Sequence, residues 1–179
     1  MMMILYTSIR LKVPAKEVFR KISSTFFTAF STGSGTAAIP SMSRELSDNF
    51  GVESGFLNYW LPFSASFFSP SVLFSIIVYT FFALESQGVS LGMEGLLILY
   101  VLTMVMVVAA PKIPGGIMAT IAIIFSELGL NTDQMGIIMG ANVIVLYFAT
   151  GVGSMTKALC GALLAYQKGY CNEKILRKT

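Results

Sequence analysis

The sequence predicts an all-α membrane protein that combines spanning helices with two re-entrant helical hairpins. Apolar residues make up 55% of its 179 residues and charged residues only 12%, whereas a soluble domain carries about 25% charged residues. Two long apolar stretches are interrupted near their middle by small, polar or prolyl residues. Because a soluble fold of this size could not bury so much apolar surface, we expect lipid to be the solvent of the chain.

The positive charges gather near the two ends of the chain. They are Arg10, Lys12, Lys16, Arg20 and Lys21 in the first cluster, and Lys168, Lys174, Arg177 and Lys178 in the second. The positive-inside rule places both clusters in the cytoplasm, so we expect a multi-pass protein of the inner or plasma membrane with a cytoplasmic C-terminus. Nucleic-acid binding is not expected, because the stretches between the clusters are lipid-like.

Residue types that carry chemistry are scarce. The chain has no histidine, and its two cysteines, Cys160 and Cys171, lack metal-ligand spacing. Histidine metal sites and Ser-His triads are therefore excluded. Without a base, nucleophile or metal set, we expect neither an enzyme nor a bound cofactor.

The apolar pattern divides the chain into three parts. We expect the end of a preceding helix and a basic cytoplasmic link in residues 1–21, a central membrane region in residues 22–168 and a basic cytoplasmic tail in residues 169–179. Within the central region, the expected elements are a first hairpin over 22–40, a broken helix over 55–84, a second hairpin over 96–130 and a last helix over 135–166.

The first interrupted stretch is ISSTFFTAFSTGSGTAAIP, residues 22–40. Glycine and hydroxyl residues at its middle would leave backbone groups unpaired in lipid, which is tolerated where protein or a water-filled cavity surrounds them. We expect a hairpin tip near Ser34, Gly35 and Thr36; a polar loop between two ordinary elements is the alternative. The stretch that follows, residues 41–54, is expected to be a polar link with helix-capping serines at its start.

Two further interruptions involve proline. Ser69-Pro70-Ser71 lies in the middle of the expected helix 55–84, where proline kinks a helix and frees a carbonyl. The second hairpin breaks at Pro111-Lys112-Ile113-Pro114-Gly115-Gly116. Two interrupted hydrophobic segments in one chain are the pattern that points to the binding site of a transporter.

Several residues are candidates for binding a substrate. The backbone amides of Ser34, Gly35 and Thr36 could hold an anion, or these small residues could serve close helix packing. The same two interpretations apply to the tip of the second hairpin. The remaining candidates are Pro114, Gly115 and Gly116 at that tip, and Asn142 and Thr150 in the last helix, which lie eight positions apart on one helical face and could bond a substrate or a neighbouring helix.

Lys157 is the most informative charge, because an ionisable residue inside a spanning segment indicates a functional site. We expect it to act as a tethered cation, or alternatively to extend toward the cytoplasmic interface. That interface is roughly 15 Å away along a helix. Lys112 could supply charge for an anionic substrate or lie at the outer interface.

Four short motifs carry a resemblance to the sodium:dicarboxylate symporter family, over about residues 13–168. TAFSTGSGTAAIP stands where that family has its serine-rich first hairpin. LPFSAS resembles the family's Leu-Pro-x-Gly-Ala-Thr, IPGG resembles its Val-Pro-Gly tip, and LGL follows at the family's distance. Residues 22–168 therefore resemble the transport domain of glutamate-transporter homologues.

The resemblance implies a symporter-like secondary active transporter of a small organic anion, such as a dicarboxylate or amino acid. Alternating access with hairpin gates would be the mechanism. It also implies membrane lipid, a small-molecule substrate and scaffold helices as partners, with a possible homotrimer. The scaffold would come from another chain or from a missing N-terminal part, so we expect a fragment, divergent member or split gene product.

Some family positions differ here. Ser66 aligns with a threonine ion ligand, but Phe68–Val72 replaces the family's Asn-Met-Asp-Gly-Thr. Leu146 and Ala149 stand at the substrate-binding Asp and Arg positions, and Lys157 stands at a sodium-binding Asp. These replacements speak against sodium coupling through the family's ligands. The alternative function is a non-transporting structural or assembly protein of the membrane with a decayed site.

Overall fold

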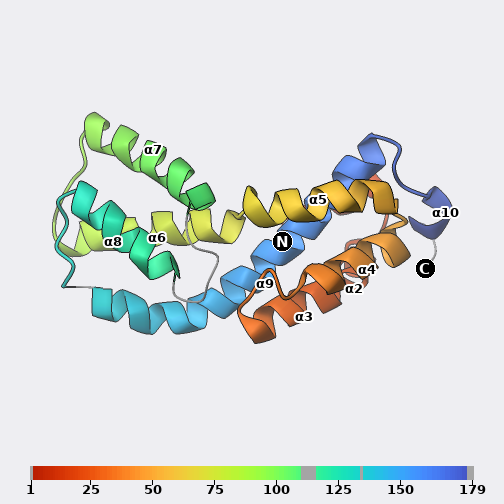
Figure 1. Ribbon diagram of the computed structural model, residues 1–179, viewed down its shortest axis with the longest axis horizontal. Helices are drawn as coiled ribbons and strands as arrows, with labels where there is room; N and C mark the ends of the chain where they lie inside the picture. The colour runs from red at the N-terminus through yellow and green to blue at the C-terminus, as the bar shows by residue number, and fades with distance from the viewer. Residues whose placement is uncertain (1, 110–115, 134, 177–179) are drawn as a thin grey trace. The chain divides into compact units, whose positions relative to one another are not determined.

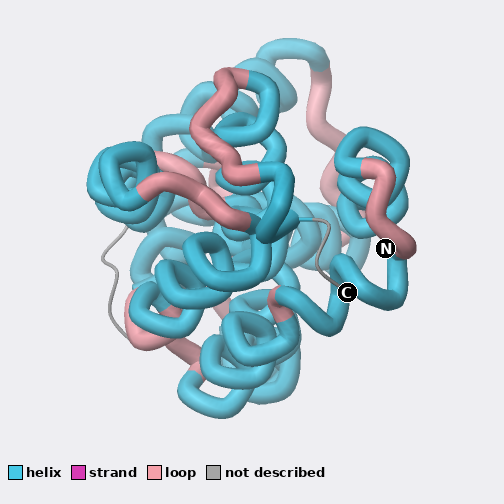
Figure 2. Tube along the Cα trace, turned by 90° about the vertical axis from the view of Figure 1, so that its right-hand side faces the viewer, coloured by secondary structure: helices cyan, strands magenta, loops and turns pink. Residues whose placement is uncertain are grey.

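The computed structural model describes residues 2–109, 116–133 and 135–176, which form helices and no named strand (Figure 2). The helices fall into two compact units, one made of residues 1–66 and 147–179 and the other of residues 67–146. In chain order the helices are α1 (Met2–Leu11), α2 (Ala15–Lys21), α3 (Ser23–Thr32), α4 (Ile39–Phe50), α5 (Ser54–Ser66), α6 (Pro70–Ser86), α7 (Met93–Ala109), α8 (Gly116–Glu127), α9 (Met135–Gln167) and α10 (Glu173–Leu176) (Figure 1).

Two stretches are long and apolar enough to cross a bilayer: Ser54–Ser86, which contains α5 and α6, and the 33-residue helix α9. Large apolar side chains remain exposed on the long helices, for example Ile144 at 78% and Leu97 at 60%. Exposed apolar surface on this scale suits contact with lipid. The helical membrane fold expected from the sequence agrees with these features.

The expected break in the helix over residues 55–84 lies at its proline. Helix α5 ends at Ser66 and α6 begins at Pro70, with Ser69 as the N-cap. Proline suits the first turn of a helix because the missing N–H would have no intrahelical acceptor there. Pro62, in contrast, lies inside α5 without ending it.

The core of the first unit gathers side chains from α2, α4, α5 and the C-terminal part of α9. Its large buried members include Leu46, Phe50 and Leu159. Trp60 of α5 lies against Gly161 of α9, where an added β-carbon would clash with the indole nitrogen. This glycine therefore sets how closely α5 and α9 approach.

The expected polar link over residues 41–54 is wrong for residues 41–50, which belong to helix α4. Its buried residues Met42, Leu46 and Phe50 recur every four positions, while Arg44 and Asp48 are exposed. This apolar stripe makes α4 an amphipathic helix although its mean composition is polar. The helical hairpin thus runs from Ser23 to Phe50, beyond the expected 22–40, with α3 and α4 side by side (Figure 1).

The second unit contains α6, α7, α8 and the first turns of α9. Helix α6 packs on α7 and α8 around Ile76, Ile121, Ile124 and Phe125. The end of α6 is tied to the loop after α8, because the Gln87 amide donates to the Asn131 carbonyl and accepts from the Asn131 N–H, both at 2.9 Å. Helices α7 and α8 are the two limbs expected for the second hairpin, and residues 110–115 between them lie outside the described residues.

Candidate functional site

The tip of the first hairpin is set by a glycine. Helix α3 ends at Thr32 and is capped by Gly33, whose φ of 62° lies in the left-handed region that glycine adopts without strain. Six residues later α4 begins at Ile39, with Pro40 in its first turn. Ser34, Gly35 and Thr36 therefore lie at the tip, where the sequence placed them.

The tip packs along the C-terminal part of α9. A β-carbon built on Gly33 would lie 3.1 Å from Cε1 of Tyr147. One built on Gly35 would lie 3.3 Å from Ser154 Oγ and 3.9 Å from Lys157 Nζ. Tyr147, Ser154 and Lys157 are separated by seven and three positions and so share one face of the helix.

Small residues allow this close approach. Gly151 of α9 faces α3, because an added β-carbon there would lie 3.1 Å from the Phe26 ring and 3.2 Å from Phe30 Cβ. The Phe148 ring packs edge-on against both of these phenylalanines. Aromatic packing thus holds α3 against α9 below the tip, and glycines bring the two backbones together.

Hydroxyl groups order the tip itself. Thr32 Oγ1 donates to the Thr28 carbonyl at 2.7 Å and accepts from the Ser34 N–H at 3.2 Å. Ser34 Oγ accepts from the Ala37 N–H at 3.3 Å. The Ser34 side chain therefore stabilises the conformation of the loop. The backbone N–H groups of Gly35 and Thr36 have no acceptor among the described residues, so they remain available to an anion.

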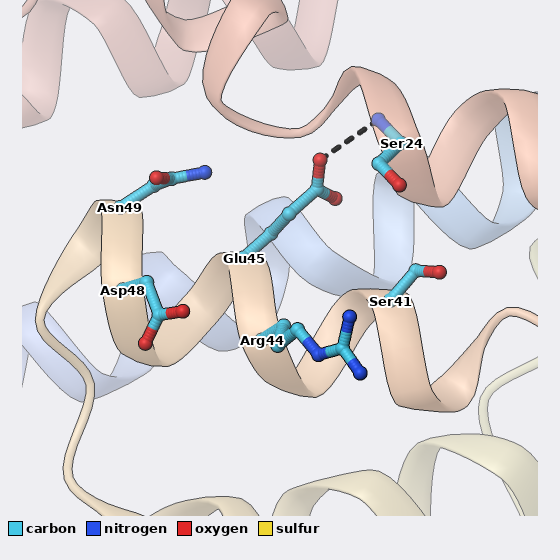
Figure 3. Close-up of a pocket in the computed structure, with 6 residues that line it drawn as sticks. All are labelled: Ser24, Ser41, Arg44, Glu45, Asp48 and Asn49. Atoms are coloured by element: carbon cyan, nitrogen blue, oxygen red, sulfur yellow. Dashed lines mark hydrogen bonds between the residues drawn. The ribbon is translucent and has the colours of Figure 1, made fainter.

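A buried carboxylate fixes the other end of α3. Glu45 of α4 is 8% exposed and accepts hydrogen bonds from the N–H groups of Ser24 at 2.8 Å and Thr25 at 2.9 Å. These amides lack intrahelical acceptors in the first turn, and negative charge is favourable there. Figure 3 shows Glu45 reaching from α4 to Ser24 beside a shallow pocket of about 190 Å³ that Ser41, Arg44, Asp48 and Asn49 also line.

A buried lysine ties the base of the hairpin to the end of the chain. Lys21 Nζ donates to the carbonyls of Leu176 at 2.6 Å and Asn49 at 3.1 Å, and Asn49 Nδ2 donates to the Lys21 carbonyl at 2.7 Å. Burial lowers the pKa of Lys21; nearby Glu17 raises it and Arg20 lowers it. The hairpin is thus anchored at its base to the end of the described chain.

The other expected site residues are placed as follows. Asn142 is buried on α9 in the second unit, where its Oδ1 accepts from the Tyr79 hydroxyl at 3.0 Å, which is the helix-to-helix bond offered as its alternative role. Thr150 is half-buried on α9, and Ser66 is exposed at the end of α5. Gly116 is buried at the start of α8 and its carbonyl accepts from Thr120 Oγ1 at 3.2 Å. Lys112, Pro114 and Gly115 lie outside the described residues.

The sequence patterns did not indicate two residues that the structure shows to be important, Ser154 and Glu45. Ser154 lies beside Gly35 and is 2% exposed. Its position three residues before Lys157 could have indicated a shared face. Glu45 caps α3 across the hairpin, and no local spacing signals such a contact.

These features define an all-α membrane protein in which the tip of a helical hairpin lies against a long apolar helix that carries a lysine. The chain belongs to the sodium:dicarboxylate symporter family, whose family model matches residues 1–167.

Relatives with similar sequences include Neutral amino acid transporter A of Homo sapiens and of Bos taurus, each 29% identical over 154 residues, 86% of this chain. Neutral amino acid transporter B(0) of Homo sapiens is 30% identical over 138 residues, 76% of this chain. The chain spans 28%, 28% and 25% of the length of these relatives, respectively.

Proposed function

We propose that this chain supplies the moving, substrate-binding elements of a secondary active transporter for a small organic anion. The substrate would be an amino acid or a dicarboxylate, since both carry a carboxylate, and the hairpins would gate alternating access. Family membership supports the class of transporter. The approach of the hairpin tip to Lys157 supports the anionic substrate.

The tip offers complementary chemistry for a carboxylate. The free N–H groups of Gly35 and Thr36, the Ser154 hydroxyl and the Lys157 ammonium belong to one small region of the first unit. Backbone amides and an ammonium are the donors that hold carboxylates, and charged hydrogen bonds are the stronger ones. The second hairpin, with Pro114, Gly115 and Gly116, would act as the other gate, and Ser66 and Thr150 of the first unit would contribute hydroxyl groups.

Lys157 would also act as a tethered cation. A fixed positive charge beside the tip would neutralise the substrate without a bound metal ion, so we expect transport without sodium bound at the family's ligand positions. Scaffold helices and a possible homotrimer would complete the transporter, and the C-terminus would face the cytoplasm.

The proposal is tested by thermal unfolding of the purified chain in lipid nanodiscs with a panel of ligands. Succinate, aspartate and serine represent the proposed class, and choline and glucose are controls. A ligand that binds the native state raises the midpoint. A rise with at least one carboxylate, lost in Lys157→Met, supports the proposal. A flat response to the whole panel, also with scaffold helices co-expressed, favours the non-transporting assembly protein, for which the replaced Leu146 and Ala149 positions argue.

A further inference from the structure

A group of basic side chains at the turn between α1 and α2 has no role in the proposed transport site. Arg10, Lys12, Lys16 and Arg20 are all exposed within eleven residues. Arg20 forms an ion pair with Glu17 at 2.6 Å. Arg10, Lys12 and Lys16 make no ion pair with any described residue, so three positive charges at this turn face outward uncompensated.

An exposed apolar stripe leads directly into this basic turn. On α1, Met2, Leu5, Tyr6 and Ile9 are exposed by 85%, 51%, 50% and 74%. Their spacing of three, four and seven positions places them on one face of the helix, and Thr7 and Leu11 are buried on the other side. An exposed apolar face followed by basic residues matches the order of acyl chains and headgroups at a membrane surface.

Lys12 occupies a backbone conformation that glycine would adopt more easily. Its φ of 56° is the one positive value among the described non-glycine residues. The Val13 N–H donates to the Ser8 carbonyl at 3.2 Å, so Lys12 stands at the position after the helix end where glycine is the usual residue. A lysine in a strained conformation points to a use of its side chain outside the fold.

We propose that this turn, Arg10, Lys12 and Lys16, binds the phosphate groups of anionic phospholipids while the apolar stripe of α1 contacts their acyl chains. Each basic residue near an anionic membrane surface contributes attraction that falls off within a Debye length. Three uncompensated charges give this turn a preference for anionic over zwitterionic lipid. The positive charges of the turn are complementary to the negative headgroups. Because the adjoining apolar stripe of α1 can also contact acyl chains, the turn should bind a lipid in preference to a soluble anion.

The test measures which lipid stays with the protein. The full chain is equilibrated with equal amounts of phosphatidylglycerol and phosphatidylcholine of the same acyl chains, and retained lipid is quantified by mass spectrometry. We expect enrichment of phosphatidylglycerol in the wild type. The triple variant R10Q/K12Q/K16Q should lose roughly tenfold or more of that enrichment. A matched control, R44Q/K168Q/K174Q, removes three other exposed charges and should keep most of it.

Lys12→Gly separates lipid binding from folding. Glycine relieves the left-handed strain, so this variant should unfold at a midpoint equal to or higher than that of the wild type while retaining less phosphatidylglycerol. Glycerol 3-phosphate at millimolar concentration should not displace the lipid. Equal enrichment in wild type and triple variant, an equal loss in the control variant, or displacement by glycerol 3-phosphate would overturn the proposal.

Discussion

Gly35 at the tip of the first hairpin faces Lys157 of α9, with the ammonium nitrogen 3.9 Å from where a β-carbon of residue 35 would lie. The two residues are far apart in the sequence and belong to the same compact unit. A positive charge on an apolar spanning helix thereby meets a loop in which the Gly35 and Thr36 N–H groups have no acceptor among the described residues. An ammonium and a backbone N–H are both donors, so both can hold a carboxylate.

Replacing Lys157 tests this relationship directly. Lys157→Met should weaken substrate-dependent stabilisation roughly tenfold or more in ligand concentration, because a charged hydrogen bond is lost. The midpoint without ligand should change less than the ligand response does. Lys168→Met, just beyond the end of α9, is the control and should alter neither quantity. Unchanged ligand response in Lys157→Met would remove the lysine from the site.

At Gly33, a side chain would lower stability in two ways that can be measured separately: backbone strain and a close contact with Tyr147. Gly33→Ala should destabilise the chain by about 1–2 kcal/mol from left-handed strain, plus the cost of its 3.1 Å approach to Tyr147. Gly129 has a φ of 66° and nothing within 4 Å of an added β-carbon, so Gly129→Ala measures the strain alone. Denaturant unfolding of both variants gives the difference. An equal loss of unfolding free energy in the two variants would mean that the Tyr147 ring moves aside without a measurable cost.

The Glu45 cap predicts a local loss of protection. Glu45→Ala removes a buried acceptor from two N–H groups, at an expected cost of about 1–3 kcal/mol. Hydrogen exchange should accelerate first at Ser24 and Thr25. Glu45→Gln keeps one acceptor oxygen and should fall between wild type and Glu45→Ala, while Asp48→Asn on the exposed side of α4 should match wild type. Uniform acceleration along the chain would contradict a local cap.

Lys21 predicts an alkaline rise in stability. Because burial lowers its pKa in the folded chain from 10.5, the unfolded chain binds more protons over the pH range just below 10.5. The free energy of unfolding should therefore increase with pH through that range, since stability rises wherever the unfolded state holds more protons. Lys21→Met should flatten this slope, and Lys16→Met, which is exposed, should preserve it. Chemical denaturation at several alkaline pH values provides the measurement.

The sequence predicted the elements whose signals are local. Pro70 interrupts a helix because of its ring, and Gly33 ends a helix because its backbone can adopt a positive φ. Both breaks could therefore be predicted from the residue type alone. Helix α4 was misjudged because its mean composition is polar, although Met42, Leu46 and Phe50 repeat every four residues. The Glu45 cap depends on a turn that folds α4 back onto α3, and no neighbouring residue encodes that contact.

The site was predictable only in part for the same reason. A lysine in an apolar helix and small residues in an interrupted helix each stand out alone, so Lys157 and Gly35 were named. Their approach, and the role of Ser154 between them, depends on packing of Phe26 and Phe30 against Gly151. Phe26 and Phe30 are ordinary apolar residues, and the sequence does not indicate which residues they contact in the fold.

The bond between Lys21 and Leu176 joins residues 155 positions apart. During synthesis, the base of the first hairpin therefore stays incomplete until Leu176 has left the ribosome, whereas residues 67–146 form a continuous stretch that can fold earlier. A chain cut before Leu176 should thus leave α2 and α4 dependent on chaperones and insertion machinery for longer.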